Sequence, residues 1–234
     1  MTDDLRYLID LVKEASLMIT DEFIVKAKDD HGDLVTNFDL AIEKFMIEKL
    51  NEKYPNFDII SEEYHSDKAL TDNCFTIDPI DGTINFAHNI PIWAIQIAMI
   101  KKGNVVASVI YAPKLDELYY ADSNGAYLNG LPIHVNNIPP RNGLYCIEGN
   151  GGAFKNNDNF LPRNYRDFHC ASLSFAYVAC GRLNGIIFNF HTYWDYVPGM
   201  YLIKQAGGIT YDEENRHLAA NNEEYLSLLK ANIN

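Results

Sequence analysis

Ile77-Asp78-Pro79-Ile80-Asp81-Gly82-Thr83 is the segment of this 234-residue chain with the densest set of chemically useful side chains. It begins at the end of a short apolar run, residues 74–77, which we expect to form a strand. Pro79 has a fixed φ and no N–H, so we expect the backbone to turn sharply between Asp78 and Asp81. Both carboxylates can then face one point just beyond the end of the strand.

The same segment also offers backbone groups to a ligand. The Ile80 carbonyl lies between the two carboxylates, and ligands that are all oxygen suit a hard cation such as Mg²⁺. Gly82 allows close approach of a ligand, and the N–H groups of Gly82 and Thr83 stand where a helix could begin, which is a natural position for a phosphate. The alternative is an ordinary turn, because Asp, Pro and Gly are also common turn residues.

Other acidic residues stand at the ends of expected strands or the starts of expected helices. Glu62 and Glu63 follow an apolar run over 57–61, Asp195 opens an expected helix, and Asp39 forms a potential capping box with Thr36. Each has a simpler alternative, as a solvated surface acid or as a helix N-cap. If the acids converge, carboxylates about 4 Å apart repel by about 4 kcal/mol at an effective dielectric constant of 20. Such a cluster would protonate or hold cations, and bound Mg²⁺ would make it a receptor for phosphate.

The remaining sequence mixes helical and strand patterns. Two hairpins are expected, and the turn-rich segment Asn136–Gly143 is the best internal boundary. We therefore expect one domain, 1–234, made of closely packed halves over about 1–138 and 139–234. The patterns predict helices over 3–20, 36–54, 172–181, 195–206 and 223–230, strands over 57–61, 74–77, 93–100, 105–111, 118–121, 126–128, 185–190 and 209–211, and a loop over 149–167.

Composition and charge exclude several classes of protein. Hydrophobic residues make up 47% and charged residues 22%, values typical of globular domains. The 4 Cys show no CxxC pair or zinc-ligand spacing, which argues against a disulfide scaffold. A formal charge of −13 argues against nucleic-acid binding. The acidic N-terminus does not resemble a signal peptide and no stretch is apolar enough for a membrane helix, so we expect a cytoplasmic protein.

Taken together, the motifs resemble the inositol monophosphatase family of Mg²⁺-dependent, lithium-sensitive phosphatases. Residues 33–39, DLVTNFD, are similar to its D-x-V-T-x-x-D segment, and Ile60-Ser-Glu-Glu63 to its G-E-E motif. Residues 77–86, IDPIDGTINF, are similar to D-P-[IL]-D-G-T-x-N-F, and residues 194–199 followed by 205–208 to W-D-x-x-x-G…A-G-G. The likeness covers nearly the whole chain. It implies a layered αβαβα sandwich of mixed α and β structure, of the inositol monophosphatase or sugar phosphatase type, and a homodimer.

The resemblance also implies two to three Mg²⁺ ions per site, for which Mn²⁺ could substitute. Glu62, Asp78 and the Ile80 carbonyl would hold one ion. Asp78, Asp81 and Asp195 would hold a second. Glu62 would help to hold a weaker third through waters, with Glu63 in or beside that shell.

The same resemblance implies the catalytic group, Thr83, Asp39 and Glu62. Thr83, paired with Asp39, would orient and activate the attacking water, and the N–H groups of Gly82 and Thr83 would grip the substrate phosphate. Lys28 is near the position where family members often carry a site lysine. The implied reaction is hydrolysis of a small phosphate monoester, as in inositol-1-monophosphatase.

Departures from the family pattern leave the substrate open. Ser61 replaces a Gly, Ser174 replaces an Asp, and Phe188 replaces a Glu that contacts substrate hydroxyls in the family. Phe188 cannot accept a hydrogen bond. The segment over about 145–170, which borders the substrate pocket and subunit contact in the family, is shorter than usual. Fructose-1,6-bisphosphatase or NADP and nucleotide phosphatase activity on the same fold is therefore the alternative, and an inactive metal-binding or ligand-binding relative is the alternative that is not an enzyme.

Overall fold

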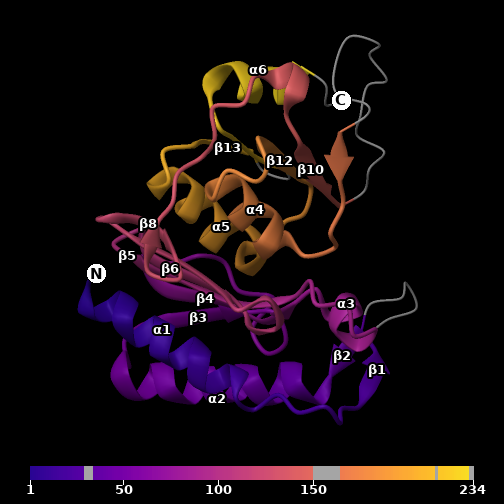
Figure 1. Ribbon diagram of the computed structural model, residues 1–234. Helices are drawn as coiled ribbons and strands as arrows, with labels where there is room; N and C mark the ends of the chain where they lie inside the picture. The colour runs from indigo at the N-terminus through magenta and orange to yellow at the C-terminus, as the bar shows by residue number, and fades with distance from the viewer. Residues whose placement is uncertain (29–33, 150–163, 214–215, 232–234) are drawn as a thin grey trace.

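The structure, a computed structural model, describes residues 1–28, 34–149, 164–213 and 216–231 and stacks them in five layers (Figure 1). Two helices cover one face of a seven-stranded sheet, two more separate it from a five-stranded sheet, and a last helix covers the outer face of that second sheet. The αβαβα sandwich implied by the resemblance is therefore confirmed. The helices are α1 (Asp3–Ser16), α2 (Asn37–Lys53), α3 (Thr83–Ala87), α4 (Ala171–Ala179), α5 (Tyr193–Gln205) and α6 (Glu223–Ala231), with 3₁₀ turns η1 (Pro113–Leu115) and η2 (Pro140–Asn142).

The larger sheet has the strand order β3-β4-β5-β6-β7-β8-β9, in which β3 and β4 are parallel and all other neighbours are antiparallel. The predicted hairpin of β5 with β6 is confirmed, and Lys102 and Gly103 make its turn with positive φ. The predicted hairpin of β7 with β8 is confirmed too. The strands are β3 (Asp58–Ser61), β4 (Asn73–Asp81), β5 (Ala94–Lys101), β6 (Asn104–Ala112), β7 (Glu117–Asp122), β8 (Gly125–Leu128) and β9 (Leu131–Pro132).

The smaller sheet has the order β11-β10-β12-β14-β13 and lies between two apolar layers. Cys146 and Ile186 belong to the core around α4 and α5, whereas their neighbours Tyr145 and Ile187 pack with α6. Both faces are buried, so β10 and β12 are apolar at nearly every position instead of alternating. Its strands are β10 (Tyr145–Glu148), β11 (Tyr165–Arg166), β12 (Gly185–Phe188), β13 (Ile209–Glu213) and β14 (Arg216–Ala220), and a separate pair is formed by β1 (Val25–Ala27) and β2 (Leu34–Thr36).

Helices α4 and α5 form the middle layer, and a glycine lets them approach closely. A Cβ atom on Gly199 would lie 2.3 Å from the Cβ of Phe175, so the two helices can pack as they do only with glycine at this position. Pro198 lies inside α5, beyond its first turn. Gly207, with φ of +83°, ends the helix as predicted, and the N–H of Gly208 donates to the Ile203 carbonyl over 2.9 Å.

Three sequence expectations were wrong in detail. β4 does not stop at Ile77 but continues to Asp81, with a register shift between Asp78 and Asp81, since Pro79 interrupts the ladder without ending the strand. The first helix ends at Ser16 and not at residue 20. β14 was not predicted, although it pairs with both β12 and β13, and the strands β1, β2, β9, β10 and β11 were not predicted either. Most of the loop expected over 149–167 lies outside the described residues.

Candidate active site

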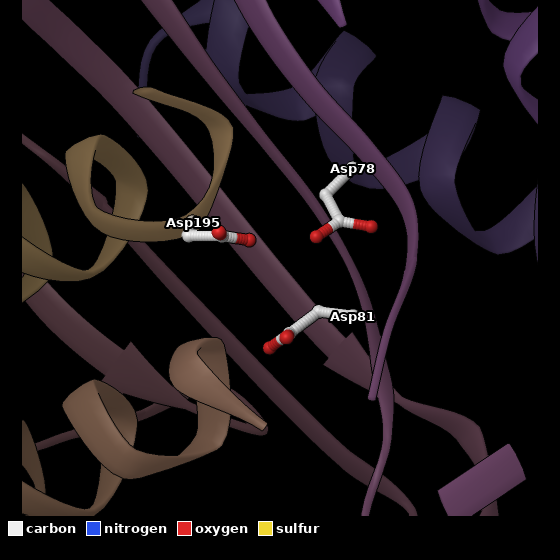
Figure 2. Close-up of side chains that lie close together, drawn as sticks. All are labelled: Asp78, Asp81 and Asp195. Atoms are coloured by element: carbon white, nitrogen blue, oxygen red, sulfur yellow. The ribbon is translucent and has the colours of Figure 1, made fainter. Parts of the chain in front are cut away.

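Two aspartates of the larger sheet and one from the middle layer of helices converge (Figure 2). Asp78 and Asp81 come from β4, and Asp195 comes from the first turn of α5. One carboxylate oxygen of each lies within 4.8 Å of the others. Asp78 is 1% exposed and Asp81 is 8% exposed, so little solvent screens this negative charge.

Asp78 is held by the local turn that Pro79 produces. Its Oδ1 accepts a hydrogen bond from the N–H of Ile80 over 3.0 Å. In the antiparallel ladder its neighbour on β5 is Gln96. Backbone geometry therefore presents the Asp78 carboxylate on the face of the sheet that packs against α4 and α5.

Asp81 is held by the start of α4. The N–H groups of Ala171 and Ser172 donate to it over 3.2 and 2.6 Å, and the Ser172 hydroxyl and the Cys170 thiol donate as well. The N-terminus of α4 therefore faces Asp81, where free N–H groups and the helix dipole stabilise an anion. Ser172 was not predicted as a site residue, since only the fold brings it to Asp81.

Asp195 lies at the third position of α5, because Thr192 and not Asp195 is the N-cap residue. The Thr192 hydroxyl donates a hydrogen bond to the Asp195 carboxylate. This contact orients the carboxylate toward Asp78 and Asp81 (Figure 2). The simpler alternative, in which Asp195 serves only as a cap, is therefore wrong.

Burial and mutual repulsion raise the pKa values of this cluster. The pKa of Asp195 rises to about 7, first through burial and then through the charge of Asp81. The pKa of Asp78 rises well above its usual value through burial and the charges of Glu62, Asp81 and Asp195. Burial also raises the pKa of Asp81, although its hydrogen bonds from Ser172 oppose the rise. The three carboxylates offer only oxygen ligands, which suit a hard divalent cation. A bound cation would also offset the repulsion between the carboxylates.

Glu62 and Glu63 lie in the turn after β3, and both form an ion pair with the ammonium group of Lys28. Lys28 Nζ lies 2.7 Å from Glu62 Oε1 and 2.6 Å from Glu63 Oε1. Burial raises the pKa of Glu62 to about 8, Lys28 lowers it, and the charge of Asp195 raises it again. The charge of Glu62 thus interacts with those of Asp78 and Asp195, while its side chain pairs with Lys28.

The turn that carries these glutamates is supported by Glu43, which is fully buried on α2. Its carboxylate accepts from the N–H groups of Glu63 and Tyr64 over 2.9 and 2.8 Å and from the Ser61 hydroxyl over 2.5 Å. Ser61, which departs from the family pattern, therefore has a structural partner. Glu43 was not predicted as a site residue, because in the sequence it is one of several acidic residues on a helix.

Thr83 and Asp39 lie next to each other at the start of two helices. The Thr83 hydroxyl lies 2.9 Å from the Ile80 carbonyl and 3.3 Å from Asp39 Oδ1. The other oxygen of Asp39 accepts from the N–H of Thr36 over 2.8 Å and from its hydroxyl, which completes the predicted capping box. Burial raises the pKa of Asp39, and the hydrogen bonds from Thr36 and Thr83 lower it.

Gly82 joins the strand to α3 in a conformation that requires glycine. Its φ is +86°, and a Cβ there would lie 2.9 Å from the Ile92 carbonyl oxygen. Within α3, Asn85 Nδ2 donates to the Ile92 and Phe168 carbonyls, each over 2.8 Å. The first of these bonds fixes the short helix to the segment that leads into β5, and the second ties it to the C-terminal part of the chain.

These groups surround a cavity of about 330 Å³. Its wall includes Glu148, which was not predicted and which lies at the end of β10 beside Phe188 of β12. Burial raises the pKa of Glu148 to about 7, the Ser174 hydroxyl lowers it, and the charges of Asp167 and Asp81 raise it.

Asp33 and residues 150–163 lie outside the described part of the chain. The described wall is formed by Glu62, Asp78, Ile80, Asp81, Gly82, Thr83, Ile84, Glu148, Gly149, His169, Cys170, Ala171, Phe188, Phe190 and Asp195.

Comparison with known families gives the same result as the motifs. The sequence profile described as "Inositol monophosphatase family" matches residues 2–229 of the chain. The chain belongs to the inositol monophosphatase family. It is therefore an enzyme, a metal-dependent phosphatase that hydrolyses small phosphate monoesters.

Individual relatives extend over most of the chain. The chain is 30% identical over 209 residues to a protein of Thermotoga maritima named fructose-1,6-bisphosphatase/inositol-1-monophosphatase, which covers 86% of this chain and 80% of that protein. It is 33% identical over 229 residues to an inositol monophosphatase of Dictyostelium discoideum, covering 89% of this chain and 84% of that one. The solved structure of a Thermotoga maritima inositol monophosphatase superposes with a TM-score of 0.84 at 26% identity, covering 98% of this chain and 96% of that one.

Two of the three departures from the inositol monophosphatase pattern, Ser174 and Phe188, lie together in the structure. Phe188 is 1% exposed and is the direct neighbour of Glu148 across the parallel pair β10 and β12. The Ser174 hydroxyl, from α4, donates a hydrogen bond to Glu148. The wall of the cavity therefore keeps a carboxylate here, contributed by a different strand.

Of the described helices, none combines the length with the apolar composition required to cross a lipid bilayer.

Proposed function

We propose that this phosphatase uses Mg²⁺ ions held by the acidic cluster to hydrolyse a small phosphate monoester in the manner of an inositol-1-monophosphatase. The convergence of Asp78, Asp81 and Asp195 within 4.8 Å is the observation that carries the proposal. Asp195 lies more than a hundred positions from Asp78 and Asp81 in the sequence, and the burial of the three carboxylates together is costly unless a cation compensates it.

The proposed metal ligands divide into two sets. Asp78, Asp81 and Asp195 would hold one Mg²⁺, and Asp78 with the Ile80 carbonyl and Glu62 would hold another. Glu62 would also contribute to a weaker third ion, with Glu63 nearby. Bound cations of this kind polarise phosphoryl oxygens, lower the pKa of water and stabilise a leaving alkoxide.

Thr83 and Asp39 would position the attacking water. A hydroxyl has one hydrogen, so Thr83 can donate either to the Ile80 carbonyl or to Asp39, and both acceptors are within reach. When Thr83 donates to the Asp39 carboxylate, the lone pairs of its oxygen can accept a hydrogen bond from water. Thr83 thereby orients the water. Asp39 is the base that accepts the proton of the Thr83 hydroxyl while that hydroxyl takes a proton from the water.

Gly82 and Thr83 would bind the substrate phosphate. Both line the cavity, and Gly82 allows the backbone to pass close to a ligand. The N–H groups at the start of α3 are not all used within the helix and can donate to phosphoryl oxygens. This places the phosphate between the backbone and the carboxylates.

Lys28 would control the charge of the glutamate pair. Its ammonium group lies within 3 Å of both Glu62 and Glu63 in this structure. We propose that it orients Glu62 toward the cavity and balances the charge of Glu63. It thus acts as a positioning residue and not as a catalytic one.

Among the alternatives, the described wall of the cavity favours a monophosphate over a bisphosphate. No Lys or Arg lines the part of the cavity that the structure describes. A second phosphate group, as in fructose 1,6-bisphosphate or NADP, needs cationic partners. By resemblance, we also propose a homodimer, inhibition by lithium and a cytoplasmic location.

Replacing Asp81 by Asn tests the metal assignment. Asn keeps an oxygen that can accept from the N–H groups at the start of α4, so we expect the fold to survive while turnover with Mg²⁺ falls at least about a hundredfold. The measurement is kcat for a phosphate monoester, with the melting temperature as a control on folding. Activity at the level of the unmodified enzyme would refute the assignment of Asp81 as a metal ligand.

A further inference from the structure

Glu148 is a buried carboxylate in the cavity wall that the proposed chemistry does not use. It is the last residue of β10 and is 4% exposed. It points to the same side of the sheet as Cys146, toward α4, where the Ser174 hydroxyl reaches it. It is the one acidic residue in the described wall of the cavity that we do not assign to the metal ions.

The two oxygens of Glu148 have different surroundings. Its Oε1 accepts from the Ser174 hydroxyl, from the N–H of Phe168 over 3.2 Å and from the Cys146 thiol over 3.4 Å. Its Oε2 has no hydrogen-bond partner among the described residues. The carboxylate is thus held through one oxygen, and the lone pairs of the other oxygen can accept a hydrogen bond from a group in the cavity.

The cavity contains a second feature that suits an organic group. Phe190 lies in the wall near Glu148, is 44% exposed, and packs on Phe188 with ring centroids 5.5 Å apart. The region away from the metal cluster thus combines a hydrogen-bond acceptor with the face of an aromatic ring. That combination suits a group with hydroxyls on its edge and C–H bonds on its face.

We propose that Glu148 is a specificity-determining residue, whose Oε2 accepts a hydrogen bond from a hydroxyl on the alcohol part of the substrate. The inference rests on the proposed function, because it takes the phosphate end of the substrate to lie at Gly82 and Thr83. It implies that a residue on β10 lets the enzyme distinguish phosphate esters of a ring with hydroxyl groups from phosphate esters of a ring without them.

Two phosphate esters that share a six-membered carbon ring test the proposal. Inositol 1-phosphate carries hydroxyls on the ring, and cyclohexyl phosphate does not. The substitution Glu148→Gln keeps Oε1 for its three donors and replaces Oε2 by an amide that cannot accept. Asp167→Asn is the matched control, because Asp167 is a nearby carboxylate that does not line the cavity.

We expect the unmodified enzyme, assayed with Mg²⁺, to prefer inositol 1-phosphate in kcat/KM. Glu148→Gln should lower kcat/KM for this ester roughly tenfold to a hundredfold, mainly through KM, since a hydrogen bond to a charged group is lost. The value for cyclohexyl phosphate should change less than about threefold. Asp167→Asn should leave the ratio between the two esters unchanged.

Equal losses on both esters in Glu148→Gln would overturn the proposal, because a structural role of Glu148 predicts that result. Should the variant fail to fold by its melting curve, monodeoxy derivatives of inositol 1-phosphate with the unmodified enzyme provide the second measurement. A tenfold drop for one derivative supports a specific hydroxyl contact, and the absence of any drop overturns it. If the unmodified enzyme hydrolyses neither ester, the proposed function itself fails; if it hydrolyses both equally well, only the role of Glu148 fails.

Discussion

Replacing Asp195 by Asn should stabilise the metal-free protein and remove most of its response to Mg²⁺. One carboxylate oxygen from each of Asp78, Asp81 and Asp195 lies within 4.8 Å of the other two. At that separation two full charges repel by at least about 3.5 kcal/mol at an effective dielectric constant of 20. Asn cannot take part in this repulsion, yet it keeps an oxygen that accepts from the Thr192 hydroxyl.

The size of the effect follows from the pKa of Asp195, which lies at about 7 instead of 3.8. A rise of that size corresponds to an unfavourable free energy of roughly 4 kcal/mol when the group is fully ionised. Nearly all of this penalty is already present at pH 7, because it builds up between pH 3.8 and 7. The substitution also replaces the bond from the Thr192 hydroxyl to a charged carboxylate by a weaker bond to an amide, which offsets about 2 kcal/mol of the gain. We therefore expect the free energy of unfolding to increase by about 2 kcal/mol, or the melting temperature by about 4–8 °C.

The pH dependence has a definite sign. Between pH 3.8 and about 7 the unfolded chain ionises Asp195 while the folded protein still holds its proton. The folded state therefore binds more protons, and its stability falls as pH rises through this range. The advantage of Asp195→Asn should be absent near pH 4 and complete above about pH 8.

Differential scanning calorimetry in EDTA and in excess MgCl₂ measures both effects. With Mg²⁺ at a hundred times its Kd, the unmodified protein should gain about 2.7 kcal/mol of stability, and Asp195→Asn should gain much less. Exposed Asp10, replaced by Asn, is the matched control and should change neither value. A variant that is less stable in EDTA than the unmodified protein, and that still gains fully from Mg²⁺, would refute the argument.

Two further substitutions test the catalytic group and the middle layer. Thr83→Ala should lower kcat by roughly 10²- to 10⁴-fold and change KM much less. Thr83→Ser keeps the hydroxyl and should remain active. An unchanged kcat in Thr83→Ala would show that Thr83 does not orient the water. Gly199→Ala should destabilise the protein by about 1–3 kcal/mol in urea titrations, because its Cβ would lie 2.3 Å from Phe175; an unchanged midpoint would show that α4 and α5 separate freely.

Features that depend on neighbours in the sequence could be predicted well. The capping box of Thr36 and Asp39, the hairpin turn at Lys102 and Gly103 and the helix start after Gly82 all form as expected. Each depends on contacts within a few residues, such as a side chain that reaches a nearby N–H. Local patterns were less reliable where longer-range pairing competes, since β4 continues past Pro79 through its pairing with β5.

β14 shows where local patterns do not suffice. Residues 216–220, RHLAA, contain no β-branched residue and two alanines, so they do not read as a strand. They form one because they pair with β12 on one side and β13 on the other, and because Leu218 and Ala219 are buried on opposite faces of the sheet. Tertiary pairing outweighs intrinsic propensity here.

From the amino-acid order alone one could identify the family, the phosphatase class and the acidic residues worth testing, because runs such as residues 77–86 carry that information locally. What the folded chain added is the set of partners that lie far away along it. Ser172 donates to Asp81 across 91 positions, and Glu148 reaches the cavity beside Phe188 because β10 and β12 run parallel. A hydrogen bond between distant residues leaves no periodic pattern in a single sequence, so only the tertiary structure could place them.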